Sequence, residues 1–353
     1  MTISPFDHPV LGGLLADEEV AKSFSARAEL EAMLAFEIAL AQAQAEIGVI
    51  PREAGAAISQ CLATFKPDIV DLRQGMAQDG VVIPRFVKQL RGAVGEPFAA
   101  HVHFGATSQD VIDTGLALRL RAVLDLLDKR LEAVIHTLTQ LDARDGEIET
   151  MAHTRMQAAI PVPAGRKIAS WRDPLERHRS RLAVVRDEAL ILSFGGAAGT
   201  LEKLGGHAQA TAEALAKRLG LREVSRPRHS ERDGVVALAS WLSLVSGSLG
   251  KMGQDVALLA QSEIGEVKLA SGGGSSAMPH KVNPVGAEVL VTLARFNATL
   301  LSGMHQSLVH ENERSGAAWT LEWMLLPQMV LATGTALRTA QTLLTSLSFQ
   351  PQR

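Results

Sequence analysis

The sequence lacks tyrosine altogether and has few other aromatic residues, which argues against a β-sheet fold. Aromatic residues make up 4% of the 353 residues, whereas strands are usually rich in aromatic and β-branched side chains. No Asn-Gly or Asp-Gly pair joins two runs of alternating hydrophobic residues, because Asp79-Gly80 and Asp233-Gly234 border helical stretches instead. We therefore expect an all-α protein.

The sequence also has little cysteine and no large excess of charge of either sign. Cys61 is the only cysteine, so neither an internal disulfide nor a thiolate metal site can form. The formal net charge is -3, with acidic and basic residues interspersed, which makes nucleic acid and anionic membranes poor partners. No cluster of His, Cys and carboxylate residues has the spacing of a metal site, and we expect no metal or organic cofactor.

The N-terminal segment and the hydrophobic runs indicate where the protein works. No basic segment followed by an apolar one opens the chain, so we expect no secretory signal. No uncharged apolar run reaches the roughly 20 residues that a membrane-spanning helix needs. We expect a cytoplasmic protein that acts on a small molecule and has no membrane partner.

Long helical periodicity is the strongest positive signal. Hydrophobic residues recur at alternating spacings of three and four in segments 116–141, 238–259 and 289–304, as they do in coiled coils and helix bundles. Small residues such as Gly247, Gly250 and Gly253 would let further helices approach closely, including helices of other subunits. The pattern predicts a long-helix bundle that forms homo-oligomers.

The N-terminal part has a different pattern. A helix starts near Ser25 and ends at Gly48 and Pro51, and shorter segments punctuated by glycine and proline follow. We place a boundary near residue 104, which gives an N-terminal helical domain (1–104) and a central long-helix bundle domain (105–353).

Three polar clusters lie at predicted helix ends, where backbone donors are free. The third, residues 271–284, reads SGGGSSAMPHKVNP. It is not a phosphate-binding loop, which needs GxxxxGK followed by Ser or Thr. A bare linker has no need of two serines, a lysine and an asparagine between prolines. The segment resembles the GSSxMPxKxNP signature of the fumarase/aspartase superfamily.

The other two clusters lie where that superfamily has its conserved regions. Residues 103–114 (HFGATSQDVIDT) resemble the first region, although Thr107 and Ser108 are also good N-caps in any protein. Residues 151–157 resemble the second region, usually Gly-Arg-Thr-His-x-Gln, with Thr154 and Gln157 retained. Arg155 stands where the lyases of the superfamily keep a catalytic histidine.

The resemblance covers residues 5–335. It implies the superfamily's long-helix bundle, a homotetramer, and active sites that gather the three clusters from different chains. The chain stops at residue 353, before the small third helical domain of most members, so we expect that C-terminal domain to be absent. Similarity is greatest to the 3-carboxy-cis,cis-muconate cycloisomerases, which implies lactonisation of that polycarboxylate in the protocatechuate branch of aromatic catabolism, the β-ketoadipate pathway.

The replacement of the catalytic histidine by Arg155 bears on the reaction. A lyase that expels an amine or hydroxide must protonate the leaving group, a task suited to histidine. In a muconate cycloisomerase the attacking group is the substrate's own carboxylate, which is already an anion at neutral pH. The histidine is therefore dispensable for lactonisation.

The resemblance also assigns roles to residues. Ser275 matches the catalytic serine and would protonate the carbon next to a carboxylate, while Lys281 and the N–H groups of the glycine run are available to activate it. Asn283 and Lys281 match groups that contact the substrate. Glu288 matches the glutamate that supports the missing histidine, and we expect it to pair with Arg155. The candidate substrate-binding residues are His103, Thr107, Ser108, His153, Thr154, Arg155, Gln157, Ser276, Met278 and Arg314.

Alternative functions stay open at this point. A fumarate-releasing lyase of the adenylosuccinate lyase type would need another acid, with His103 or His153 as candidates. A 3-sulfomuconate cycloisomerase would bind a sulfonate in place of the 3-carboxylate. A non-catalytic helical assembly is disfavoured by the intact Ser275, Lys281 and Asn283. His229 and Arg232 precede the second periodic segment and are weaker site candidates.

Overall fold

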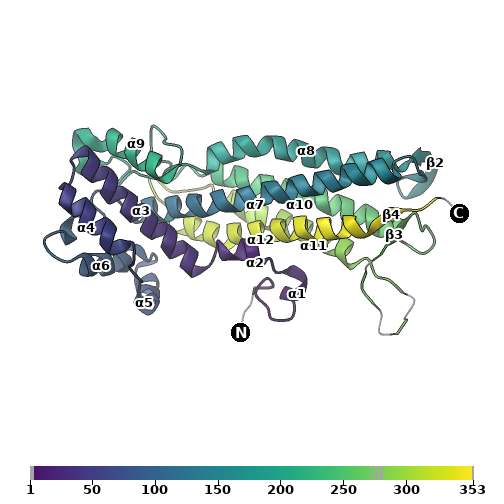
Figure 1. Ribbon diagram of the computed structural model, residues 1–353, viewed down its shortest axis with the longest axis horizontal. Helices are drawn as coiled ribbons and strands as arrows, with labels where there is room; N and C mark the ends of the chain where they lie inside the picture. The colour runs from purple at the N-terminus through teal and green to yellow at the C-terminus, as the bar shows by residue number, and fades with distance from the viewer. Residues whose placement is uncertain (1–3, 271, 275–276, 279–280, 352–353) are drawn as a thin grey trace.

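The computed structural model describes residues 4–270, 272–274, 277–278 and 281–351. Figure 1 shows an elongated molecule in which long helices run along a common axis and shorter helices gather at one end. The helices are α1 (Gly12–Leu15), α2 (Glu18–Lys22), α3 (Ala26–Ile47), α4 (Arg52–Leu62), α5 (Ile69–Asp79), α6 (Ile83–Val94), α7 (Ser108–Asp145), α8 (Ala164–Ala189), α9 (Ala208–Leu219), α10 (Asp233–Leu259), α11 (Val285–Gln306) and α12 (Ala317–Ser346), with 3-10 turns at Ala99–His101 and Glu202–His207. The predicted all-α class is confirmed.

Capping residues set the ends of the helices in the N-terminal part. The Ser25 hydroxyl accepts a hydrogen bond from the Ala28 N–H at the start of α3, and Gly48 ends that helix with a φ of +83°. The Asp68 carboxylate likewise accepts hydrogen bonds from two backbone N–H groups at the start of α5. These are the residue types that favour helix starts and left-handed helix ends, and the predicted helix from Ser25 to Gly48 is confirmed.

The three periodic segments lie in α7, α10 and α11, so the predicted long-helix bundle is confirmed. Helix α7 alone has 38 residues, which at 1.5 Å per residue makes it about 57 Å long. Its stripe residues Leu127, Leu131 and Val134 have no exposed surface. Helices α8 and α12 complete the bundle around this core (Figure 1).

Two glycines bring α10 and α11 into close contact. A Cβ added to Gly250 would lie 2.4 Å from the Ala294 Cβ, and one added to Gly253 would lie 2.5 Å from the Ala287 carbonyl oxygen. Apart from the backbone of its own helix, no described atom lies within 4 Å of a Cβ added to Gly247. The close approach predicted from small residues thus involves a helix of the same chain, and an approach by other subunits stays a prediction.

Two hydrophobic cores underlie these helices. The larger core fills the bundle and includes Trp171 and Trp241. The smaller core contains Phe36 from α3 but also Val111 from the start of α7 and Leu215 from α9. Residues beyond position 104 therefore complete the N-terminal core, and the division into two domains at that position stays a prediction.

In the described part of the chain, two small sheets that the sequence pattern did not predict lie at the end of the bundle away from the N-terminal part (Figure 1). Strand β1 (Glu149–Thr154) pairs with β2 (Gln157–Pro163), and β3 (Val267–Leu269) pairs with β4 (Leu347–Phe349), both antiparallel. The β1–β2 turn consists of Arg155 and Met156, which both have a positive φ, 48° and 66°. This turn conformation usually requires Asn or Gly, so no turn signal was visible in the sequence.

Within the described residues, two helices, α10 and α11, are long and apolar enough to cross a membrane by length and composition. Of the most apolar window, 56% is buried in α10 and 28% in α11. The exposed face of α11 is polar, with residues at alternating spacings of four and three. These residues are Glu288, Thr292, Arg295, Thr299, Ser302 and Gln306. A stripe with charged and hydroxyl side chains does not suit lipid, and it leaves α11 as a bundle helix with one polar face uncovered in the single chain.

Candidate functional site

The first cluster is built on the N-terminus of α7. Thr107 and Asp110 form a capping box, in which the Asp110 carboxylate accepts a hydrogen bond from the Thr107 N–H at 2.9 Å. Ser108 is the first residue of the helix. The positive end of the helix dipole and the free N–H groups of this turn attract anions, so the capping role and carboxylate binding are compatible.

The fully buried carboxylate of Asp110 organises this end of the bundle. Besides the Thr107 N–H, it accepts hydrogen bonds from the Gly195 and Gly196 N–H groups at 2.8 and 3.0 Å and from the His229 Nε2 at 2.8 Å. Gly195 cannot carry a side chain, because an added Cβ would lie 2.6 Å from Pro227. One carboxylate thus fixes the start of α7, the glycine turn and the segment before α10.

Arg314 joins the first cluster from a distant part of the chain. Its Nε donates to the Gln109 Oε1 at 3.0 Å, and its Nη2 donates to the Gly196 carbonyl at 3.4 Å. Gln109 is fully buried and also donates to the His229 carbonyl at 2.8 Å. The structure therefore brings Arg314 beside the helix that carries Thr107 and Ser108.

His103 interacts with a buried carboxylate of the N-terminal part. Its Nδ1 lies 2.6 Å from the Glu37 Oε1, and the side chains are 12% and 1% exposed. Burial of the ring favours its neutral form, but the charge and hydrogen bond of Glu37 outweigh that effect and raise the pKa of His103. The contact with Glu37 therefore favours the imidazolium form of His103 at the start of the first cluster.

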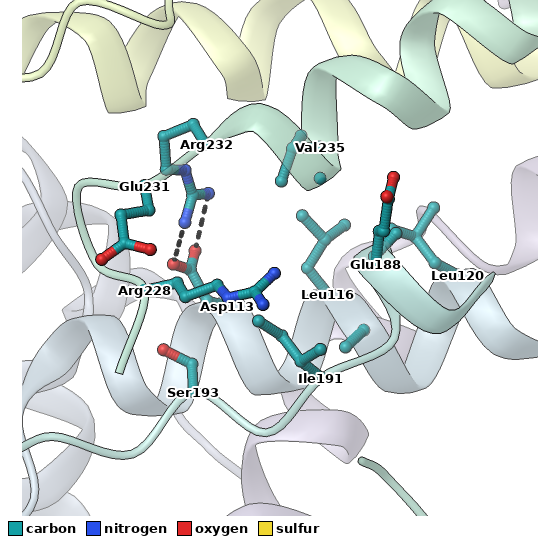
Figure 2. Close-up of a pocket in the computed structure, with 13 residues that line it drawn as sticks. Asp113, Leu116, Leu120, Glu188, Ile191, Ser193, Arg228, Glu231, Arg232 and Val235 are labelled. Carbon is teal, nitrogen blue, oxygen red and sulfur yellow. Dashed lines mark hydrogen bonds and ion pairs between the residues drawn. The ribbon is translucent and has the colours of Figure 1, made fainter. Parts of the chain in front are cut away.

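A buried ion network lies beneath the first cluster (Figure 2). The Arg232 guanidinium binds Asp113 at 2.7 Å and Glu322 at 2.5 Å, and Trp319 donates to Asp113 at 2.9 Å. Burial alone lowers the pKa of Arg232, but the two carboxylates outweigh it and raise that pKa, so Arg232 stays charged. The network holds α12 and the start of α10 against α7.

The pocket drawn in Figure 2 is too small for a substrate. Its volume is about 40 Å³, which fits about one water molecule. Figure 2 shows Arg232 directed at Asp113, with Arg228 beside it. Arg232 and His229, which were weaker site candidates, therefore have structural partners and support the first cluster from within.

The second cluster is the β1–β2 hairpin. His153, Thr154, Arg155 and Gln157 belong to this hairpin, and all four are exposed near its turn. The Glu266 Oε1 accepts a hydrogen bond from the Met151 N–H at 2.6 Å and holds the hairpin to the bundle.

A groove of about 560 Å³ lies beneath the hairpin. His153 and Arg155 line it together with Lys167, Lys251 and Asp255. The Lys167 Nζ donates to the Met151 carbonyl at 2.8 Å. Cations outnumber the carboxylate among these side chains, so the groove attracts anions.

The third cluster is a loop whose two arms pair at its base. Gly273 and Asn283 exchange backbone hydrogen bonds of 2.9 and 2.8 Å. Glycine is required here, because a Cβ added to Gly272 would lie 2.4 Å from Val282 and one added to Gly273 would lie 2.5 Å from Val285. The glycine run of the signature thus lets the two arms meet.

Only part of the predicted catalytic set can be placed in this loop. Ser275 and Ser276 lie outside the described residues. Lys281 and Met278 are exposed, and the Lys281 N–H donates to the Met278 carbonyl at 3.0 Å. The Asn283 side chain donates to the Gly274 carbonyl at 3.4 Å.

The single chain does not form the predicted pair of Arg155 and Glu288. Glu288 is exposed in the first turn of α11. None of the ion pairs within 4 Å in the described ranges joins it to Arg155. The pairing stays a prediction.

The first cluster lies at one end of α7, and the other two lie towards its other end (Figure 1). The first starts α7, and the hairpin follows its C-terminus, about 57 Å away at 1.5 Å per residue. The third cluster follows Ala270, which pairs with Ser346 next to β4, and β4 is bound to Asp145 at the end of α7 by the Phe349 N–H. One chain therefore cannot present the first cluster and the other two to the same small molecule.

Several residues that shape these clusters were not singled out from the sequence. Gln109 and Asp110 lie inside the first motif, but several of their polar contacts are with segments more than 80 residues away. Glu37 is a single acidic residue within the apolar stretch Ala35 to Ala41 of α3. An isolated charge in an apolar helix face was the one available signal for it.

Comparisons with known proteins give consistent results. A family model described as Lyase matches residues 15–297. The 3-carboxy-cis,cis-muconate cycloisomerase of Pseudomonas aeruginosa is 42% identical over 336 residues, which cover 94% of this chain and 73% of that protein. The nitrosuccinate lyase of Streptomyces davaonensis is 34% identical, over 98% of this chain and 76% of that protein.

Solved structures show the same relationship. The crystal structure of the 3-carboxy-cis,cis-muconate lactonizing enzyme from Pseudomonas putida superposes with a TM-score of 0.92 at 41% identity, covering 97% of this chain and 78% of that one. The crystal structure of a fumarate lyase from Mesorhizobium gives a TM-score of 0.90 at 34% identity, with 97% and 78% covered. The chain thus spans about three quarters of the length of these relatives.

Proposed function

Because the chain belongs to the Lyase family of the fumarase/aspartase superfamily, we propose that it is a cofactor-independent cycloisomerase that lactonises 3-carboxy-cis,cis-muconate. The observation that carries this proposal is the 42% identity over 336 residues to a protein of that name. The reaction belongs to the protocatechuate branch of aromatic catabolism, and we place the enzyme in the cytoplasm.

The reaction needs one bond formation and one proton transfer. An oxygen of a substrate carboxylate forms a C–O bond to one carbon of a C=C bond, and the other carbon, next to a carboxylate, takes up a proton. Ser275 is the proposed proton donor, and Lys281 stabilises the resulting alkoxide and the enolate-like charge on the substrate. No leaving group has to be protonated, which agrees with Arg155 at the position of the lyase histidine.

The substrate carries three carboxylates, and the clusters offer matching donors. Thr107 and Ser108 bind one carboxylate at the N-terminus of α7, supported by His103 and Arg314. His153, Thr154, Arg155 and Gln157 bind a second from the hairpin. Asn283, Ser276 and Met278 contact the substrate from the signature loop. Cationic and N–H donors of this kind are what a trianion requires.

The site is assembled from several chains of a homotetramer. This proposal is supported by the distance between the clusters, because the length of α7, about 57 Å, separates the first cluster from the other two. The uncovered polar stripe on α11 provides a face on which helices of other chains can pack, since the hydroxyl side chains of Thr292, Thr299 and Ser302 allow a close approach. Glu288 and Arg155 would then meet across such a contact.

A fumarate-releasing lyase is the second candidate. The 34% identity to a nitrosuccinate lyase favours it, and His103 with its raised pKa would supply the acid that the reaction needs. A 3-sulfomuconate cycloisomerase would keep the lactonisation chemistry and change one anionic substituent.

An ultraviolet assay with 3-carboxy-cis,cis-muconate tests the proposal, since lactonisation removes the diene absorbance. The wild type should turn over the substrate, Ser275→Ala should lose at least about a thousandfold in kcat, and Ser180→Ala, at an exposed position on α8, should match the wild type. No turnover of this substrate by the wild type, with turnover of adenylosuccinate or 3-sulfomuconate, would replace the proposal by the corresponding alternative.

A further inference from the structure

A buried carboxylate of the N-terminal part contacts the first cluster without any assigned role. Glu37 lies on α3 with 1% of its side chain exposed, and its Oε1 is 2.6 Å from the His103 Nδ1. Its Oε2 is buried and has no hydrogen-bond partner in the described part of the chain. A buried carboxylate is costly unless a nearby cation compensates it, and His103 is the group in contact.

We propose that Glu37 is a positioning residue that keeps His103 as an imidazolium, and that this cation binds a carboxylate of the substrate beside Thr107 and Ser108. The inference rests on the proposed function for the identity of the substrate, but not for the pairing itself. Glu37 contacts only the Nδ1 of His103. In the described part of the chain no acceptor takes the Nε2 N–H, which can therefore donate to a ligand.

The charged groups around His103 come from three helices. Glu37 approaches from α3, Asp110 from α7 and Arg91 from α6, and the two carboxylates outweigh the arginine. Asp110 already accepts four hydrogen bonds and acts on the ring only through space. Glu37 is therefore the group whose removal changes the charge of His103 without disturbing the Asp110 contacts.

Helix α3 also holds the backbone of the segment that carries His103. His103 has a φ of 62°, a conformation that is uncommon for residues other than glycine. Gln44, two turns after Glu37 on α3, donates to the Phe104 carbonyl at 2.6 Å. The two buried polar residues of this helix face thus fix the ring and the backbone of adjacent residues.

The charge of His103 makes carboxylate binding depend on pH in a defined direction. The imidazolium persists below the raised pKa of His103 and is lost as the pH rises through it. Glu37→Gln keeps the shape and an acceptor oxygen but removes the charge, so the loss should occur at a lower pH. A purely structural role of Glu37 would instead weaken binding equally at all pH values.

Isothermal titration calorimetry of the intact oligomer with tricarballylate, a tricarboxylate without a diene, tests the proposal. At pH 8, Glu37→Gln should bind about tenfold more weakly than the wild type, the value of one charge-assisted hydrogen bond. At pH 5.5 the difference should be smaller, because protonation of the imidazole in the variant becomes more favourable as the pH falls. Glu31→Gln, at an exposed position of the same helix, is the matched control and should bind like the wild type at both pH values.

Each outcome of the titration decides the matter. His103→Gln should bind weakly without a pH dependence, which keeps the test valid if Glu37→Gln fails to fold. A Glu37→Gln profile that parallels the wild type at all pH values, or no tricarballylate binding by the wild type, would overturn the inference. Failure of the muconate assay alone would overturn the proposed reaction and leave the binding result standing.

Discussion

Replacing Asp110 by Asn should unfold the first cluster as a unit. The carboxylate is fully buried and accepts four hydrogen bonds, from three backbone N–H groups and His229. An amide NH₂ in place of one oxygen turns two of these acceptor contacts into donor–donor contacts. Losing two charge-assisted hydrogen bonds and leaving their donors buried should lower the free energy of unfolding by about 3–5 kcal/mol.

Urea denaturation followed by circular dichroism measures this change. Asp125→Asn is the control, because Asp125 is 58% exposed in a surface ion pair with Arg186, and such pairs contribute under about 1 kcal/mol. Activity of Asp110→Asn should also fall, since Thr107 and the turn that receives Arg314 share the same carboxylate. A loss of less than about 1 kcal/mol for Asp110→Asn would refute the role of this residue as the organiser of the cluster.

Three further predictions concern the bundle and the hairpin. Gly253→Ala should lower the free energy of unfolding, measured by urea denaturation, by about 2–3 kcal/mol, because the added Cβ meets the backbone of α11. Gly247→Ala is the control and should not lower it within the chain itself. Equal effects of the two substitutions would contradict the packing argument. Burial and two neighbouring arginines lower the pKa of His178 to about 4, below its unfolded value. The unfolding free energy should therefore fall by about 1–2 kcal/mol from pH 7.5 to pH 5, and a His178→Gln variant that keeps the same slope would exclude this cause. Glu266→Gln should speed hydrogen exchange at the Met151 amide, which the wild-type carboxylate holds at 2.6 Å, and unchanged exchange would count against Glu266 as the anchor.

The sequence predicted the bundle because periodicity reports burial directly. The stripes in α7, α10 and α11 were visible because each side chain of the stripe faces the same core. Helices α8 and α12 were harder to predict, since Pro174 and Pro327 lie inside them and proline usually ends a helix. Packing against the core outweighs that local preference.

The β1–β2 hairpin could not be predicted for a different reason. Its turn residues, Arg155 and Met156, adopt a left-handed conformation that their side chains disfavour. Strained residues of this kind persist only when the surrounding structure holds them, and they are frequent at functional sites. The motif therefore marked the position of the hairpin as functional without indicating its shape.

The candidate site was predictable as a set of residues but not as an arrangement. The superfamily motifs identified Thr107, Arg155 and Lys281, yet α7 separates the first of these from the other two. Contacts such as Glu37 with His103 join positions 66 residues apart and depend on tertiary packing. Motifs name the chemical groups, and only the fold shows which groups one chain can bring together.

Mixing of two inactive variants tests the shared active site most directly. Ser108→Glu places a negative charge in the first cluster at a helix start that tolerates it, and Ser275→Ala removes the proposed proton donor of the third. If each site takes these clusters from different chains, oligomers refolded from an equal mixture should regain about a quarter of the wild-type muconate-lactonising activity, since half of the chains are intact at each position. No activity in the mixture, with both variants folded and assembled like the wild type, would contradict the account.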